Sequence, residues 1–431
     1  MKILVDHGVH GNLGDISMVE AVVLRILAVL PRAEICVMNK PNLETSIWNF
    51  PNVSKTRSYS LKPIFRDVLN KTPFFWRVDS AWQKISYKLT LQSMGTLIPG
   101  RSIPIYDNDN AAIRYNKLGK FCEEFDALHI AGGGNLTDLF LHELFNKCCF
   151  MHTFSEQNKP IILTGQQIGP FSSRSSKRAL QKVLRKVNFL GLREPTDSLN
   201  FCMEAHMEPQ RYAVMGDDSL GLMPLNDSFI SDFLAEYGLK EKEFIAANIR
   251  IAPYAKGHAD YIRQIVLIIE KVAMHFDKPV LIVPTALHPS DSDITSGKKL
   301  ADGVHHARMV VIDNDNLSPA LVKGVLGKAF GAIGISYHFC IFALSQGVPT
   351  VCLYDGAYYS QKAKGICVFW GDERLALPLK DVDVDSAVGH IAQLFKDESF
   401  REKMLSFGEK AFEQWRYKFD TRVSDILGRL N

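Results

Sequence analysis

The segment GAIGISYHFCIFALSQGVPTVCLY, at 331–354, restricts the fold of this chain more than any other stretch. It predicts an apolar strand, a turn that contains Tyr337 and His338, a short apolar helix, and a second buried strand after a Gly-Val-Pro stop. A strand, a helix and a strand in this order form a parallel β-α-β unit. Ligands of open parallel sheets bind at the carboxyl ends of the strands, where the next helix offers free N–H groups. His338 is therefore a candidate site residue, and the alternative is a histidine that only caps the helix.

Strands and helices alternate along most of the chain, in two series separated by a lapse into loop. A chain of 431 residues is also too long for one ordinary core. The pattern predicts an α/β fold of two doubly wound, Rossmann-like domains that face each other across a cleft. We place the N-terminal domain at 1–225, the C-terminal domain at 240–385, and helices that pack back across the cleft at 386–431.

The segment 55–101 interrupts this alternation. It holds nine Lys or Arg residues against two Asp, and seven aromatic residues are interleaved with them. This composition suits helices on an anionic lipid surface, or a groove for a large acceptor. The alternative is a solvated insertion that packs its aromatic residues on its own domain.

Charge and cysteine content exclude some classes of protein. The net charge is only +3, so the chain as a whole is not built to bind nucleic acid. Its eight cysteines form no C-x-x-C pair and lie mostly in apolar patterns, as expected of reduced thiols, and no metal site is indicated. The first residues lack a signal-peptide core, and no apolar run approaches the roughly 18 residues that cross a bilayer. We therefore expect a cytoplasmic protein, with peripheral contact at the inner face of the membrane left open.

The first predicted strand is followed by GVHGNLGD, at 8–15. Its three glycines allow the backbone to approach a ligand closely. They are weak evidence for a dinucleotide site, because the second strand closes on Asn39 and Lys40 rather than on an acidic residue. Asp15 follows in the first helical turn, where it serves either the helix dipole or catalysis.

Further polar residues cluster at the predicted strand ends, where a cleft between domains would gather them. They are Asn12, Asp15, Asn135, Gln166, Gln167, Arg193, Glu194, Asp217, Asp218, Arg250, His338 and Lys362. Several cations in one cleft suit a small ligand with carboxylate and phosphate groups, since a guanidinium grips such groups through two parallel hydrogen bonds. Arg193 and Arg250 have a structural alternative, as partners in salt bridges.

The chain resembles the polysaccharide pyruvyl transferases over about 8–370. The resemblance rests on short motifs in a fixed order: GNLGD (11–15), AGGGN (131–135), GQQIGPF (165–171), GLREPTDS (191–198), MGDDS (215–219), the segment from His338 through ALSQGVP, and YYSQKAKGI (358–366). Such enzymes move an enolpyruvyl unit from phosphoenolpyruvate to a sugar and form a pyruvate ketal. The resemblance implies a glycosyltransferase-B-like fold. It places phosphoenolpyruvate contacts on Arg193, His338 and Lys362, with Asp15 at the acidic N-terminal position.

One motif departs from the family pattern. Members usually show Arg-Leu-His where this chain has Ser336, Tyr337 and His338, so the arginine is lost and the histidine is kept. Either Arg250 supplies the missing charge or the donor differs.

The ketal reaction assigns roles to the candidate residues. A carboxylate near the sugar oxygen serves as general base, for which Asp15 is suited, and His338 donates to phosphate or shuttles a proton. Cations stabilise charge on the departing phosphate. We expect substrate binding by Arg193, Lys362, Arg250, Asn12, Asn135, Gln166, Gln167 and Tyr337. The scheme requires no cofactor and no metal.

We therefore expect a pyruvyl transferase that acts on a sugar of a cell-surface polysaccharide, such as an exopolysaccharide, or on its lipid-linked precursor. Two alternatives stay open: a glycosyltransferase that uses a nucleotide sugar on the same fold, and a non-catalytic partner in polysaccharide assembly. The sequence decides neither the acceptor sugar nor the oligomeric state, and a homo-oligomer is left open.

Overall fold

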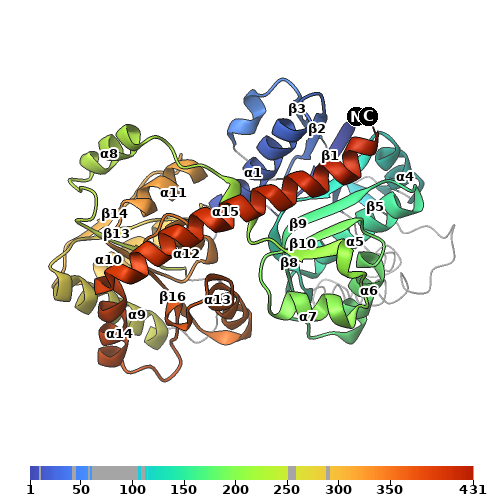
Figure 1. The fold of residues 1–431 in the computed structure, drawn as a ribbon. Helices are drawn as coiled ribbons and strands as arrows, with labels where there is room; N and C mark the ends of the chain where they lie inside the picture. Colours follow the sequence, from blue (N-terminus) through green and yellow to red (C-terminus); the bar gives the residue numbers. More distant parts are fainter. Residues whose placement is uncertain are drawn as a thin grey trace, which may run out of the picture.

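Two parallel β-sheets, one in each half of the chain, organise the computed structural model (Figure 1). The structure describes residues 1–8, 11–40, 45–56, 59–60, 105–107, 112–113, 115–250, 259–287 and 292–430. Most of the basic and aromatic segment predicted at 55–101 lies outside these residues. Among the described helices, none is both long enough and apolar enough to cross a membrane.

The N-terminal sheet has eight strands, in the order β11-β10-β9-β7-β1-β2-β3, with β8 beside β9. The strands are β1 (Lys2–Asp6), β2 (Glu34–Met38), β3 (Val53–Thr56), β7 (Ala127–Ile130), β8 (Gly133–Leu136), β9 (Ile161–Ile168), β10 (Phe189–Leu192) and β11 (Tyr212–Val214). All of their pairings are parallel. The chain runs outward from β1 to β3 and later resumes at β7, on the other side of β1. The carboxyl ends of β1 and β7 therefore flank the crevice where such sheets bind ligands.

The C-terminal sheet has six parallel strands, in the order β14-β13-β12-β15-β16-β17. They are β12 (Ile245–Asn248), β13 (Val280–Ile282), β14 (Met309–Val311), β15 (Gly331–Gly334), β16 (Thr350–Tyr354) and β17 (Ala376–Pro378). Here the order reverses between β12 and β15. The segment that opened our sequence analysis thus supplies a central strand, β15, and the helix that follows it.

Helices surround both sheets (Figure 1). They are α1 (Leu13–Val29), α4 (Tyr115–Glu123), α5 (Leu141–Glu156), α6 (Arg174–Leu184), α7 (Asp197–Glu204), α8 (Asp227–Glu236), α9 (Ala259–Phe276), α10 (Asp293–Asp302), α11 (Pro319–Gly327), α12 (Tyr337–Leu344), α13 (Gly356–Trp370), α14 (Val384–Lys396) and α15 (Glu398–Leu427). Short 3₁₀ turns include η1 (Ser46–Asn49), η3 (Asp138–Phe140) and η5 (Asp218–Gly221). A small antiparallel sheet joins β4 (Tyr59–Ser60), β5 (Ile105–Asp107) and β6 (Ala112–Ile113).

The apolar residues of the central strands are buried on both faces of each sheet. In β1, Ile3 and Val5 join one hydrophobic cluster, whereas Leu4 joins the cluster on the other face. This division follows from the strand period of two residues. It also explains why these strands show continuous apolar runs rather than an alternation of apolar and polar residues.

Backbone hydrogen bonds at the start of α1 and the long helix α15 both connect the two domains. At the start of α1, the Leu13 N–H donates to the Thr285 carbonyl and the Leu287 N–H donates to the Gly11 carbonyl, each at 2.8 Å. Helix α15, shown in red, runs from the C-terminal domain across to the N-terminal domain (Figure 1). The two predicted parallel-sheet domains are therefore present, while the residue limits proposed for them stay a prediction.

Candidate active site

His338 lies in the first turn of α12, directly after β15, and its side chain is 7 % exposed. The N-terminal domain meets it at Gly14, in the first turn of α1. A Cβ atom added to Gly14 would stand 2.0 Å from the His338 ring, so only a glycine lets α1 approach this closely. Asn12 caps the same helix, because its Oδ1 accepts a hydrogen bond from the Gly14 N–H at 2.9 Å. The GNLGD motif therefore places helix α1 against His338.

Asp217 connects the histidine to the N-terminal sheet. Its Oδ2 lies 3.6 Å from His338 Nε2 and 3.5 Å from Arg193 Nη1, which are ion-pair distances rather than hydrogen bonds. Burial raises the pKa of the Asp217 carboxyl, but His338 and Arg193 outweigh burial and hold that pKa well below its usual range. The carboxylate is therefore ionised at neutral pH and orients both side chains.

Arg193 follows β10 and is only 2 % exposed. Its guanidinium carbon lies 3.9 Å from the centre of the Tyr337 ring, so the planar group stacks on an aromatic face. Burial lowers the pKa of Arg193, but the Tyr337 hydroxyl and Asp217 outweigh burial and raise it overall. Nε and Nη2 have no hydrogen-bond partner among the described residues. Buried donors are nearly always paired, so these two nitrogens indicate a place for an anionic ligand.

The two neighbouring glutamines of β9 have different roles. The Gln166 amide donates to the carbonyl oxygens of Ile130, Ala131 and Thr164, at 3.3, 2.9 and 2.8 Å, and thereby ties β7 to β9. The Gln167 side chain is fully buried, and neither its oxygen nor its nitrogen has a partner in the described part of the chain. Side chains of successive strand residues point to opposite faces. Gln167 therefore offers its amide nitrogen as donor and its oxygen as acceptor to a ligand, whereas the Gln166 amide nitrogen donates within the sheet.

Gly134 marks the point where Gln167, Arg193 and the C-terminal domain come together. A Cβ atom on Gly134 would lie 3.1 Å from the Tyr358 hydroxyl and 3.6 Å from both Arg193 Nη2 and Gln167 Oε1. Tyr358 belongs to α13 of the C-terminal domain, and its ring lies 5.9 Å from that of Phe140 in η3. The glycine turn of AGGGN is thus covered by a tyrosine from the opposite domain, a residue that our sequence analysis did not identify as part of the site.

Lys362, one turn further along α13, is half-buried, and its Nζ lies 4.2 Å from the centre of the Tyr358 ring. The pKa of Lys362 is lowered to about 7, mainly by burial and also by Arg193 and Arg250, while Asp15 acts in the opposite direction. Arg193, Arg250 and Asp15 thus all lie within electrostatic range of Lys362, and these residues come from both domains.

Arg250 follows β12, the strand that pairs with β15. In that pairing Asn248 lies beside Gly334, so Arg250 and Ser336 each come two residues after paired positions. Ser336 has no charge to offer, and its Oγ accepts a hydrogen bond from Thr285 Oγ1 at 2.9 Å. The family motif would place an arginine at position 336, after β15. Arg250 occupies the corresponding position after the neighbouring strand, β12.

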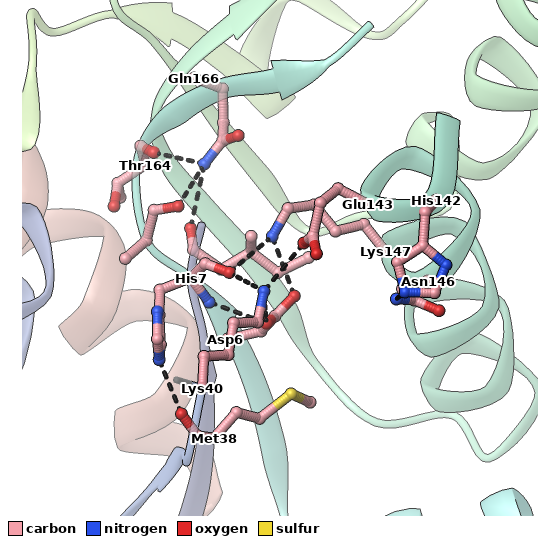
Figure 2. A network of polar contacts seen from close by, with 12 residues as sticks. Asp6, His7, Met38, Lys40, His142, Glu143, Asn146, Lys147, Thr164 and Gln166 are labelled. Carbon is pink, nitrogen blue, oxygen red and sulfur yellow. Dashed lines mark hydrogen bonds and ion pairs between the residues drawn. The ribbon is translucent and has the colours of Figure 1, made fainter. Parts of the chain in front are cut away.

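A buried charged network supports the carboxyl end of β1 (Figure 2). Asp6 pairs with Lys147 at 3.0 Å and with Lys40 at 3.2 Å, and Lys40 also pairs with Glu143 at 2.9 Å. Burial raises the pKa of Asp6, but the two lysines outweigh it and lower the value to about 2. Burial lowers the pKa of His7 to about 3, so the ring is neutral and its Nε2 donates to the Met38 carbonyl at 2.7 Å. This network fixes the carboxyl end of β1.

Asn135 lies against Gly8, two residues after the end of β1. A Cβ atom on Gly8 would come within 1.7 Å of its Nδ2, so the Asn135 side chain occupies the space that the glycine leaves open. Asn135 is half-buried, in β8. Of the amides predicted to bind substrate, Asn12 and Gln166 thus serve the fold in this structure, whereas Asn135 and Gln167 border the site.

Together these residues form an interdomain site in which anion-binding groups converge. Arg193, Asp217 and His338 are linked by ion pairs, and buried atoms of each, with both ends of Gln167, have no hydrogen-bond partner in the described residues. Among those residues, no group of three or more His, Cys, Asp or Glu side chains is placed to hold a metal ion. The arrangement suits a small ligand that carries carboxylate and phosphate groups.

Solved structures with the same architecture have very different sequences. UDP-GlcNAc 2-epimerase from Neisseria meningitidis, bound to UDP-GlcNAc, is 12 % identical with a TM-score of 0.59, and the match covers 100 % of both chains. Arabidopsis thaliana UGT89C1, complexed with UDP-L-rhamnose, is 11 % identical with a TM-score of 0.57, and 98 % of each chain is covered. A search of curated proteins finds no match. These likenesses confirm the predicted glycosyltransferase-B-like fold and carry no information on the substrate.

The family comparison is more specific. A family model described as polysaccharide pyruvyl transferase matches residues 12–356, a span that begins at the cap of α1 and ends at the first residue of α13. It contains Asp15, Gln167, Arg193, Asp217, Arg250 and His338. The chain belongs to the polysaccharide pyruvyl transferase family and is a transferase.

Proposed function

We propose that this protein takes phosphoenolpyruvate as its donor and forms a pyruvate ketal on a sugar of a cell-surface polysaccharide or of its lipid-linked precursor. The observation that carries the proposal is the Arg193 guanidinium, which is buried, stacked on Tyr337, and left with two unpaired nitrogens. A buried cation of this kind is costly unless an anion completes its hydrogen bonds. Phosphoenolpyruvate carries a carboxylate and a phosphate, which the surrounding cations can share.

The residues can divide the chemistry in a simple way. A proton adds to C3 of the enolpyruvyl group while one sugar hydroxyl attacks C2, and a second hydroxyl then displaces phosphate from C2. Asp15 accepts the proton of the attacking hydroxyl as general base, and His338 donates a proton to the phosphate as it departs. The two protons lost by the two hydroxyls balance the proton gained at C3 and the proton that leaves with phosphate. Arg193, Arg250 and Lys362 stabilise the charge that accumulates on the phosphate. The proposed scheme uses no cofactor and no metal ion.

Arg250 takes the role of the arginine that is missing at Ser336. Its position after β12, level with Ser336 after β15, supports this assignment. The electrostatic interaction by which Arg250 lowers the pKa of Lys362 supports it as well. The positive charge that is missing at Ser336 is then supplied by Arg250. This favours an active enzyme over a non-catalytic partner in polysaccharide assembly.

Because phosphoenolpyruvate is a cytoplasmic metabolite, the proposal places the reaction in the cytoplasm, at the inner face of the membrane where the acceptor is lipid-linked. A nucleotide-sugar donor is the competing proposal, supported only by fold similarity at 11–12 % identity.

Thermal-shift titration tests the donor directly. Phosphoenolpyruvate should raise the melting temperature of the wild type, because a ligand that binds only the folded state stabilises it. The Arg193→Lys variant keeps the charge but loses the planar fork, and it should show a much smaller shift. A shift with UDP-GlcNAc or UDP-glucose and none with phosphoenolpyruvate would reverse the assignment. Release of inorganic phosphate from phosphoenolpyruvate with lipid-linked oligosaccharides would then measure turnover.

A further inference from the structure

A pocket of about 950 Å³, separate from the anion site around Arg193 and His338, lies between the domains beside α1. Leu13, Ile16 and Glu20 form its N-terminal wall, and their spacing puts them on one face of the helix. Its C-terminal wall comes from the start of α10 and from the segment 313–320, which connects β14 to α11. Ligand sites of this size are common at domain interfaces.

The pocket and the anion site share the first turns of α1. Gly14 faces His338, whereas Leu13 and Ile16 line the pocket, so the two sites lie on different faces of the same helix. An α-helix with its side chains is about 10–12 Å across. A ligand of several linked sugar units can therefore reach from the pocket to the reacting position.

The charges of the pocket differ from those of the anion site. Among the described lining residues there are three carboxylates, from Glu20, Asp313 and Asp315, and one cation, Lys298. Lys298 already pairs with Asp313 at 2.7 Å. Such a lining repels phosphate groups, which makes the pocket unsuitable for phosphoenolpyruvate or for a nucleotide diphosphate.

The lining combines hydrogen-bonding groups with apolar surface. Hydroxyl and amide groups of Thr45, Ser46, Thr295 and Asn316 stand beside the carboxylates, and leucine and isoleucine side chains complete the walls. A sugar ring presents hydroxyl groups at its edge and C–H groups on its faces, so it can use both kinds of surface.

One wall is held in place before any ligand binds. Glu20 Oε1 accepts hydrogen bonds from Thr45 Oγ1 at 2.6 Å and from the Ser46 N–H at 3.2 Å, which fixes the start of η1 against α1. Preorganisation of this kind lowers the entropic cost of binding.

We propose that this pocket binds neutral sugar units of the acceptor, next to the unit that receives the ketal. The inference rests on the proposed function, because it assigns the pocket to the acceptor of that reaction.

A bulky substitution tests the assignment. Thr295→Trp fills the pocket from an exposed position in α10, and Lys299→Trp is the matched control, exposed on the same helix but outside the lining. The probes are neutral tetrasaccharides of gluco, galacto and manno configuration, with UDP as an anionic comparison, each followed by saturation-transfer NMR. At least one tetrasaccharide should bind the wild type and Lys299→Trp, and its affinity should fall at least tenfold in Thr295→Trp.

A second variant keeps the test independent of how well the tryptophan is accommodated. Asp315→Ala removes an exposed hydrogen-bonding group from the lining and should weaken the same tetrasaccharide without changing the melting temperature. The proposal is overturned if no tetrasaccharide binds the wild type, if binding is equal in Thr295→Trp, or if UDP binds here and competes with the sugar.

The failure of this proposal can be told apart from that of the proposed donor. Phosphoenolpyruvate should produce the same thermal shift in Thr295→Trp as in the wild type, since the anion site lies on another face of α1. Sugar binding without any phosphoenolpyruvate shift refutes the donor assignment and leaves the pocket assignment standing. A thermal shift with phosphoenolpyruvate but no sugar binding refutes the pocket assignment and leaves the donor assignment standing.

Discussion

The imidazole of His338 occupies the place where a side chain on Gly14 would begin. A Cβ atom there would stand 2.0 Å from the ring, and the two residues belong to different domains. The N-terminus of α1 therefore contacts the histidine directly, and the geometry of the site depends on the absence of one methyl group.

Gly14→Ala should reduce turnover strongly. The new methyl group must push His338 away or separate the domains, and a misplacement of about 1 Å at a reacting group can cost roughly a hundredfold in rate. The measurement is phosphate release from phosphoenolpyruvate. Gly389→Ala in α14 is the control, since its Cβ would meet no atom within 4 Å, and it should keep full activity. Equal activity of both variants would show that His338 is not needed where the structure places it.

Arg193 and Asp217 should behave as a coupled pair. Arg193→Ala removes a site cation and deprives the buried Asp217 carboxylate of its arginine partner, so it should abolish most activity and also destabilise the fold by about 3 kcal/mol. Adding Asp217→Asn should restore much of the stability, because the unpaired charge is then gone, but no activity. Urea unfolding of the two single variants and the double variant measures the coupling. Additive changes in the free energy of unfolding would argue against the pair.

Much of this site could be predicted from the sequence, because its residues follow apolar strands that are visible as local patterns. Arg193, Arg250, His338 and Lys362 were found in this way. The difference between Gln166 and Gln167 could not be predicted, since it depends on which face of β9 meets the crevice. Asp217 was only one of two adjacent aspartates, and its pairing with His338 arises from contact between domains. Tyr358 gave no signal of its own, because its role depends on how α13 covers Gly134.

The affinity for phosphoenolpyruvate should fall as the pH rises above 7. The pKa of Lys362 is lowered to about 7 by burial and by neighbouring arginines, so its positive charge is fully present below that value and is lost above it. Between pH 7 and 9 the KM for phosphoenolpyruvate should therefore increase, by up to about tenfold per pH unit where binding requires the charge. Lys362→Arg, which stays charged, should show a flatter profile over the same range. Parallel profiles for the two proteins would mean that another group titrates.

Substitutions at Arg250 and Ser336 can move a positive charge from the end of β12 to the end of β15. Arg250→Ser should raise the KM for phosphoenolpyruvate by about 10- to 100-fold, as expected for the loss of a charge-assisted hydrogen bond of roughly 1.5–3 kcal/mol. The double variant with Ser336→Arg restores a cation at the position of the family motif and should recover most of the affinity. Wild-type affinity in Arg250→Ser alone would rule out the relocated charge.

Helix α15 should contribute a pH-dependent part of the stability through Trp415. Its indole N–H donates to Asp218 Oδ1 at 2.9 Å, while Thr164 Oγ1 and the Gly132 N–H donate to Oδ2. Burial raises the pKa of Asp218 to about 7, and these hydrogen bonds oppose the shift by stabilising the ionised form. The raised pKa means that the folded state binds more protons than the unfolded state between about pH 4 and 7, so Asp218 makes the protein less stable as the pH rises through that window.

Trp415→Phe removes the indole donor and should therefore cost more above pH 7, where the carboxylate is ionised, than at pH 5.5, where it is largely protonated. We expect a loss of about 1–3 kcal/mol at pH 8 from the unsatisfied carboxylate, in addition to a packing loss that is the same at both pH values. Trp370→Phe is the matched control, because Trp370 is fully buried and its N–H has no partner among the described residues. Both variants are unfolded chemically at the two pH values. A difference for Trp415→Phe alone supports the bond to Asp218, and equal losses at both pH values would show that Trp415 stabilises the protein by packing only.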